Sequence, residues 1–260
     1  MDHKEWVFLS PHFDDVVLSC GGLVWDLENQ GHTVRVWTIM AGFPSDENFS
    51  PFAQQNHQAW GKAGAEAIAM RREEDINACQ VLGARSRHFS WMDAIYRHHP
   101  ETGLPLVNNN EELFSALPES ALIEEVAKKL AQEIPADAIL VSPMGLGGHL
   151  DHRVVVQAGQ KTGRVNFYFA DYPYILWDFD SSHLTDSIYQ IIPRPLSKEA
   201  LYHWQNAILC YSSQLSAFWQ DEDETRLAIL NYLAGGGGRL WEKLKRKHDN
   251  PYLDSPTAER

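Results

Sequence analysis

Two short clusters of histidine and aspartate residues carry the clearest chemical signal in this sequence. Residues 11–15 read Pro-His-Phe-Asp-Asp, and residues 149–152 read His-Leu-Asp-His. Each cluster follows a short apolar run that is typical of a β-strand. Imidazole and carboxylate groups bind divalent metals and transfer protons. The clusters lie far apart in the chain, so the fold has to bring them together, and two such strand ends predict one hydrolytic metal site.

The number of candidate ligands fits a catalytic centre. Two histidines and one aspartate are a usual ligand set for catalytic zinc and leave one position open for water. A carboxylate that is not a ligand must accept the proton of that water, and Asp14 is placed for this beside Asp15. A helix N-cap is the simpler interpretation of the first cluster, but it explains one aspartate only.

The second cluster adds a means of fixing a histidine ring. Asp151 lies between His149 and His152, three residues apart, and these rings can point to one side of a loop that leads into a helix. A carboxylate in this position can accept a ring N–H and so fix the tautomer of a ligand histidine.

The elements expected before and after the first cluster form a βαβ unit. Trp6–Ser10 and Thr33–Met40 are expected strands, and between them Val17, Leu23, Val24 and Leu27 share one helical face. A βαβ unit favours a parallel sheet, in which ligand sites lie at the carboxyl ends of the strands.

The rest of the chain continues this alternation in one domain covering residues 1–260. Residues 96–119 are rich in Pro, Asn and Glu and predict a surface insertion or lid. The other expected elements are a helical region over 54–82 that is broken near 61–64, a strand over 87–90, a helix ending at Pro135, a strand over 138–141, a helix from His152, strands over 165–170 and 187–192, helices from Lys198 and a C-terminal tail over 239–260.

Composition excludes several classes of function. The 260 residues are 44% hydrophobic and 22% charged with a net charge of −13, which is typical of a globular chain and opposes binding to nucleic acid or an anionic membrane. The basic run at 243–247 is interpreted as the solvated face of a terminal helix. The expected location is the cytoplasm, because the sequence lacks a membrane-length apolar run and a signal peptide, and its three cysteines are too few for a disulfide framework.

The two clusters together resemble the motifs of the PIG-L/LmbE-like zinc-dependent N-deacetylases. The family's first motif is usually Ala-His-Pro-Asp-Asp-Glu and its second is His-x-Asp-His. The resemblance implies a Rossmann-like α/β fold with a mostly parallel sheet and helices on both faces. It also implies removal of an acetyl group from a small N-acetylglucosamine-type sugar or its conjugate. Phe13 and Val16 depart from the first motif at positions that supply no ligand, which leaves the substrate open.

The resemblance assigns a role to each matched residue. The implied metal ligands are His12, Asp15 and His152, with Zn²⁺ as the default ion and Fe²⁺ as an alternative. The implied catalytic residues are Asp14 as general base, His149 for stabilising the oxyanion or protonating the leaving amine, and Asp151 for orienting His149.

A third stretch supports the same resemblance, which covers roughly residues 5–170. The run Arg71-Arg-Glu-Glu74, followed by Leu82-Gly83, is similar to the family's Arg-x-x-Glu helix. The resemblance implies that Arg71 and Asp93 contact the sugar. An ion pair of Arg71 with Glu74 or Asp75 is the alternative for the arginine. Among nine tryptophans, Trp91 is the expected sugar-stacking residue because it lies near Asp93.

Other functions remain open from the residues alone. An amidase that cleaves a larger acyl group would use the same site. A non-haem iron oxygenase also uses two histidines and a carboxylate, and His149-x-Asp151 has its spacing. A non-catalytic Rossmann-like binding module is the third alternative, although no Gly-x-Gly-x-x-Gly follows the first strand. The sequence also leaves homo-oligomerisation open.

Overall fold

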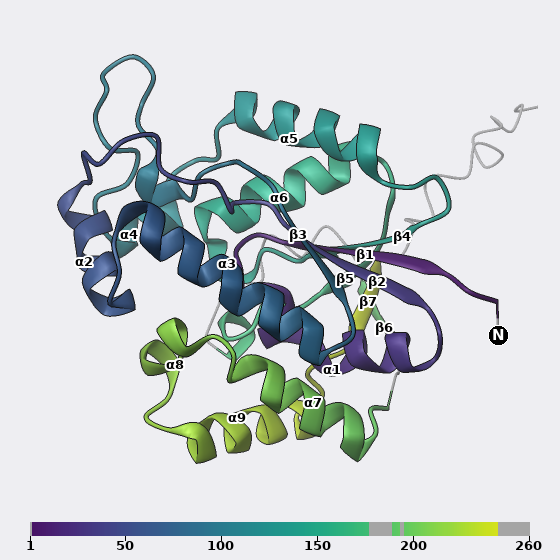
Figure 1. Ribbon diagram of the computed structural model, residues 1–260. Coiled ribbons are helices and arrows are strands. Elements are labelled where there is room, and N and C mark those ends of the chain that lie inside the picture. The colour runs from purple at the N-terminus through teal and green to yellow at the C-terminus, as the bar shows by residue number, and fades with distance from the viewer. Residues whose placement is uncertain (1, 177–188, 193–194, 244–260) are drawn as a thin grey trace, which may run out of the picture.

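The chain forms a single α/β domain built on a seven-stranded sheet (Figure 1). The computed structural model describes residues 2–176, 189–192 and 195–243. The strand order is β3-β2-β1-β4-β5-β7-β6, and the first five of these strands run parallel. The strands are β1 (Glu5–Ser10), β2 (Thr33–Thr38), β3 (Arg85–His88), β4 (Ile139–Pro143), β5 (Val165–Phe169), β6 (Tyr189–Ile192) and β7 (Leu240–Lys243).

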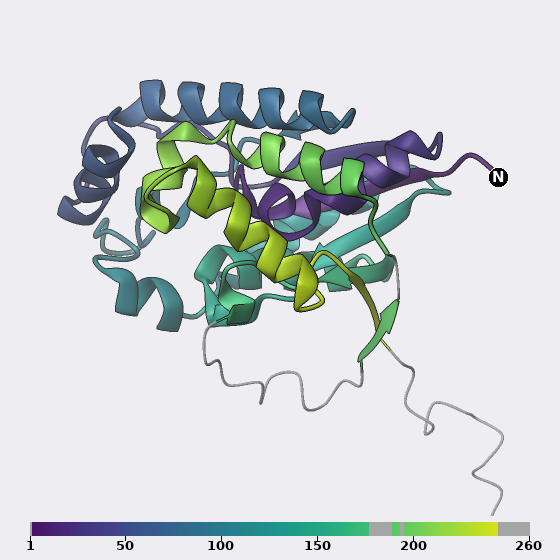
Figure 2. The same ribbon diagram turned by 90° about the horizontal axis from the view of Figure 1, so that it is seen from below.

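Helices cover both faces of the sheet, as the sequence predicts (Figures 1 and 2). In the central strand β1, Val7 and Leu9 pack on one face and Trp6 and Phe8 on the other. The first face is covered by α5 (Ser120–Glu133) and α6 (Leu150–Lys161), and the second by α1 (Asp15–Asn29), α3 (Gly64–Val81) and α7 (Lys198–Ile208). Because β1 is covered on both faces, its residues form a nearly continuous apolar run.

The chain order creates a switch point beside β1. The chain passes from β1 to β2 and β3 on one side and then returns to β4 on the other side of β1. Loops that leave β1 and β4 therefore diverge, which opens a crevice at the carboxyl ends of these two strands. Of the two motifs predicted to meet, the first directly follows β1 and the second follows β4 after the loop 144–148.

The expected insertion over 96–119 contains little regular structure. The short η1 (Ala94–Tyr96) begins it, a single bridge pairs His98 with Pro105, and α4 (Asn110–Ser115) follows. The helical region expected over 54–82 with a break near 61–64 is confirmed as α2 (Pro51–Trp60) and α3, which are separated by residues 61–63.

The C-terminal part is helical as expected but ends in a strand. Helices α7, α8 (Ser212–Phe218) and α9 (Glu222–Ala234) lead to the glycine run 235–238. The expected tail then contains β7, which runs antiparallel to β5 and β6. Lys243 ends this strand, so it does not begin a terminal helix; the rest of the basic run, and residues 187–188 of the expected strand over 187–192, lie outside the described residues.

Within the described ranges, no helix combines the length and the apolar character that a membrane span requires.

Candidate functional site

The loop after β1 holds the first motif in a tight, hydrogen-bonded turn. The backbone N–H of His12 donates to Asp15 Oδ2 at 2.7 Å, and Ser10 Oγ donates to the carbonyl of His12 at 2.6 Å. Asp14 stands at the N-cap position of α1, yet its side chain makes no capping hydrogen bond. The helix-cap interpretation is therefore wrong for Asp14, whose carboxylate is buried without capping the helix.

The second motif follows β4 through a glycine-rich loop. Gly145, Gly147 and Gly148 all have positive φ, and a Cβ on Gly147 would lie 2.7 Å from a ring carbon of Tyr174. The turn therefore requires glycine there. It delivers His149 to the N-cap of α6 and His152 to its first turn, where His152 is fully buried.

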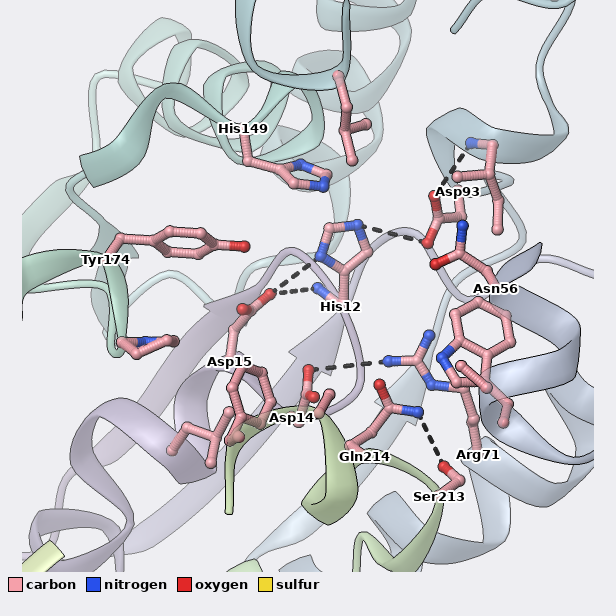
Figure 3. Close-up of a pocket in the computed structure, with 18 of the residues that line it drawn as sticks. His12, Asp14, Asp15, Asn56, Arg71, Asp93, His149, Tyr174, Ser213 and Gln214 are labelled. Atoms are coloured by element: carbon pink, nitrogen blue, oxygen red, sulfur yellow. Dashed lines mark hydrogen bonds and ion pairs between the residues drawn. The ribbon is translucent and has the colours of Figure 1, made fainter. Parts of the chain in front are cut away.

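The fold brings both motifs together, as predicted. Asp15 is the meeting point, since its Oδ2 lies 3.3 Å from His12 Nδ1 and its Oδ1 lies 3.3 Å from His152 Nε2. Ligand atoms of His12, His149 and His152 lie within 4.8 Å of one another, and so do those of His12, Asp93 and Asp151. Figure 3 shows His12 between Asp15 and Asp93, with His149 above it.

The far nitrogen of each of two rings is fixed by a buried carboxylate. His12 Nε2 lies 3.1 Å from Asp151 Oδ2, and His152 Nδ1 lies 2.7 Å from Asp171 Oδ1. An ionised carboxylate only accepts, so both of these nitrogens donate. The other nitrogen of each ring, Nδ1 of His12 and Nε2 of His152, faces Asp15.

Asp171 was missed by sequence reasoning. It directly follows β5 and Ala170, and its second oxygen accepts hydrogen bonds from the backbone N–H groups of Gly145 and Leu146 at 2.8 and 3.1 Å. This carboxylate therefore ties the glycine loop to the ring of His152. The signal that would have found it is its position at the end of a predicted strand beside β4.

Asp151 has a different partner from the one the resemblance implies. Its carboxylate bonds to His12, to the backbone N–H of Ala94 at 2.9 Å and to Arg97 Nη1 at 2.6 Å. His149 Nδ1 instead accepts from the backbone N–H of Asp151 at 3.2 Å. The expectation that the carboxylate of Asp151 orients His149 is thus not what the structure shows: the carboxylate orients His12, and the backbone orients His149.

The two residues expected to contact a sugar border the same pocket. Asp93 directs Oδ1 to the N–H of Ile95 at 3.1 Å and Oδ2 toward His12 Nε2 at 3.6 Å. Arg71 is 5% exposed and its Nη2 lies 3.8 Å from Asp14 Oδ1, while its Nε has no hydrogen-bond partner among the described residues. The alternative ion pair with Glu74 or Asp75 is wrong.

The pocket has a volume of about 730 Å³, within the range of roughly 300–1,000 Å³ for sites that hold drug-sized ligands. Asn110, Leu113 and Phe114 of the 96–119 segment line it, and the Phe114 ring meets His149 edge-on. Trp60 lines it as well, under the guanidinium of Arg71.

The expectation for Trp91 is wrong. This side chain is absent from the pocket lining; it stacks on Phe89, and its Nε1 donates to Glu125 at 2.8 Å. Another of the nine tryptophans, Trp177, lies outside the described residues.

The charge of the cluster suits a bound cation. Burial opposes protonation of His12 and His152, but Asp93, Asp15 and Asp151 raise the pKa of His12, and Asp15 and Asp171 raise that of His152 to about 9. The cluster therefore attracts positive charge to the point between these rings and Asp15. Among the described residues, His152 Nε2 faces Asp15 Oδ1 at 3.3 Å without a well-formed hydrogen bond, as expected for an atom that serves as a ligand.

Two further groups have pKa values that suit acid–base work. Burial, above all, raises the pKa of Asp14, with Asp15 adding to the effect and Arg71 opposing it. Burial, together with His12 and His152, lowers the pKa of His149 well below its ordinary value. Carboxyl and imidazole groups perturbed in this way within one pocket are typical of enzyme active sites.

The fold and the site together define a single-domain α/β protein with a buried His/Asp cluster at the switch point of its sheet. The family model "GlcNAc-PI de-N-acetylase" (PIG-L) matches residues 7–162. The chain belongs to this family.

Several similar proteins are deacetylases by name. The 2′-N-acetylparomamine deacetylase of Niallia circulans is 29% identical over 251 residues, which cover 87% of this chain and 86% of the relative. Among solved structures, a zinc-inhibited form of teicoplanin deacetylase superposes with a TM-score of 0.76 at 25% identity, covering 95% of this chain and 100% of that one. The A40926 pseudoaglycone deacetylase superposes with a TM-score of 0.70 at 28% identity, covering 94% of this chain and 98% of that one. Membership in this family disfavours the oxygenase and binding-module alternatives.

Proposed function

We propose that this protein is a divalent-metal-dependent deacetylase that hydrolyses the acetyl amide of a small N-acetylated amino sugar. The observation that carries the proposal is the convergence of His12 Nδ1, His152 Nε2 and the Asp15 carboxylate. Buried carboxylates hold the opposite nitrogen of each ring, so each lone pair faces inward. The curated relative acts on an N-acetylated amino sugar, as its name states, and supports the substrate class.

His12, Asp15 and His152 would hold the ion, with zinc as the default for a site of two imidazoles and one carboxylate. A bound ion supplies a Lewis acid that polarises the amide carbonyl and lowers the pKa of water. The zinc-inhibited form of the teicoplanin deacetylase is compatible with metal binding at such a centre. The second group of possible ligand residues, His12, Asp93 and Asp151, suits an ion less well, because Asp151 is already bonded to Ala94 and Arg97.

Asp14 would act as the general base. Its carboxylate is buried, uses neither oxygen to cap α1, and faces the pocket beside Asp15 (Figure 3). Because burial raises its pKa, this carboxylate is a stronger base than an exposed aspartate. It accepts the proton of the attacking water, and Arg71, whose Nη2 lies 3.8 Å from Asp14 Oδ1, opposes the rise in its pKa.

His149 would stabilise the tetrahedral intermediate. Its Nδ1 accepts from the backbone of Asp151, so the neutral ring carries its proton on Nε2. An N–H held in this way can donate to the oxyanion that develops on the amide carbonyl, and then to the leaving amine. Edge-on contact with Phe114 helps to hold the ring in place.

Arg71 and Asp93 would bind the sugar. Arg71 brings an unpaired buried donor and Asp93 a carboxylate oxygen to the same pocket. One donates and the other accepts, which complements neighbouring hydroxyl groups on a sugar ring.

The test is release of a free amine from N-acetylated amino sugars by the metal-loaded protein. Metal analysis should give about one equivalent, lost in His152→Ala. A series of substrates with acetyl, propionyl and hexanoyl groups decides between a deacetylase and an amidase for larger acyl groups. If acetylated lysine peptides were hydrolysed far faster than every sugar tried, the sugar class would be wrong.

A further inference from the structure

Helix α8, outside the segment that matches the family model, forms one wall of the pocket. Ser213, Gln214 and Phe218 of this helix line the same pocket as His12 and Asp14. Figure 3 shows the Gln214 side chain near Asp14 and Arg71. Sequence reasoning assigned no role to this part of the chain, and the mechanism above does not use it.

A chain of hydrogen bonds fixes the orientation of the Gln214 amide. Glu74 on α3 accepts from Ser212 Oγ at 2.8 Å, from the backbone N–H of Ser213 at 2.8 Å and from Ser213 Oγ at 2.7 Å. The single hydroxyl hydrogen of Ser213 is thus used by Glu74. Its oxygen can then only accept, and Gln214 Nε2 donates to it at 2.9 Å.

The carbonyl oxygen Oε1 of Gln214 is therefore an oriented hydrogen-bond acceptor without a partner among the described residues. With Nε2 bound to Ser213, the amide carbonyl oxygen Oε1 is the polar atom of Gln214 left for the pocket. Gln214 is only 9% exposed, and no described residue donates to Oε1. The side chain is nine-tenths buried, but Oε1 itself is not fully buried, so a donor group of a substrate can reach it from the pocket and replace water there. The glutamine therefore has the character of a recognition group awaiting a ligand.

We propose that Gln214 is a substrate-binding residue whose carbonyl oxygen accepts a hydrogen bond from a hydroxyl or ammonium group of the substrate. This inference rests on the proposed deacetylase function. A carbonyl acceptor favours donors and disfavours carboxylate or phosphate groups, so it selects a neutral or cationic sugar. Glu74 and Ser213 are positioning residues that prevent the amide from turning.

The experiment compares wild type with Gln214→Leu on the N-acetylated amino sugar that wild type hydrolyses best. It includes analogues of this sugar that each have one hydroxyl or amino group replaced by hydrogen. The leucine variant should lose on the order of tenfold in kcat/KM, mainly through KM, with normal metal content. For one analogue, the kcat/KM of wild type should fall by a similar factor. The kcat/KM of the variant for that analogue should be almost the same as for the parent sugar, as a double-mutant cycle of a direct contact requires.

A matched control is Gln205→Leu on α7, whose amide donates to the carbonyl of Arg226 away from the pocket. It should lower stability and leave kcat/KM unchanged. Ser213→Ala should give a smaller loss than Gln214→Leu, because the amide keeps its oxygen but can turn. Unchanged kcat/KM in Gln214→Leu, or an equal loss with every analogue, would overturn the assignment. If wild type released no amine from any acetylated sugar, the proposed function would fail first, before any variant was compared.

Discussion

Replacing Asp171 by asparagine should weaken metal binding without removing any proposed ligand. The carboxylate of Asp171 serves His152 with one oxygen and two backbone N–H groups with the other. Asparagine has one acceptor oxygen and one donor NH₂. If its oxygen stays with His152, the NH₂ faces two N–H donors of the glycine loop. If its oxygen turns to the loop, the NH₂ faces His152 Nδ1, and the ring proton must move to Nε2.

Either orientation has a measurable cost. If the asparagine oxygen stays with His152, the glycine loop that positions the second motif loses its two hydrogen bonds to this side chain. If the oxygen turns to the loop, His152 Nε2 is protonated and has no lone pair for the ion. Loss of such supporting partners typically weakens metal affinity by about 10- to 100-fold. This corresponds to about 1.4–2.7 kcal/mol of binding free energy.

The assay is a competition titration of zinc against a chromogenic chelator, at a pH at which wild type binds one ion. Asp137→Asn makes the same chemical change at an exposed position and is the matched control. Circular dichroism verifies that both variants are folded. If a folded Asp171→Asn bound zinc within twofold of wild type, the argument that this carboxylate fixes the tautomer of His152 would be refuted.

Three other outcomes are expected. Asp14→Asn should keep its metal and lose about 10²- to 10⁴-fold in kcat, because the amide cannot accept the proton of water; near-normal turnover would exclude this base. Arg97→Met should lower the free energy of unfolding by about 3–5 kcal/mol in urea titrations, since it leaves the buried Asp151 carboxylate without its cation, whereas Arg97→Lys should recover part of the loss. In the metal-free protein the pKa of His152 is raised from 6.5 to about 9, so its stabilising contribution is present below pH 6.5 and lost as the pH rises toward 9. Urea titrations in chelator across this window should show the decline, which a zinc-loaded sample should not; a flat profile in chelator would contradict the charge balance described here.

Local sequence was sufficient to predict the groups that lie next to each other in the chain. The strand over 6–10 and its following turn were recognisable from an apolar run and a change in polarity, and the structure confirms both. The adjacency of β1 and β4 followed only from the expectation of a parallel sheet with ligands at its strand ends. The 96–119 segment was recognised by composition alone, which gave no indication that Phe114 would contact His149.

Contacts between distant segments could not be predicted in this way. Strand β7 is four residues long, follows a run of glycines and gains its conformation from antiparallel pairing with β5 and β6. The partner of Asp151 was also unpredictable, because motif spacing places a carboxylate near two histidines without stating which ring it will meet. Arg97 decides this question by holding the other oxygen of Asp151, and an arginine in a polar insertion carries no sign of such a role.

The carboxyl ends of three strands explain how Asp171 comes to lie beside a histidine from another segment of the chain. The strands β1, β4 and β5 are parallel neighbours, and each ends in part of the same cluster. His12 and Asp15 follow β1, His152 follows β4, and Asp171 follows β5. In a parallel sheet all carboxyl ends lie at one edge, so a carboxylate after the next strand along is a natural partner for a histidine after the previous one. The same geometry makes Asp171, though distant in sequence from both motifs, as much a part of the proposed metal centre as the residues within them.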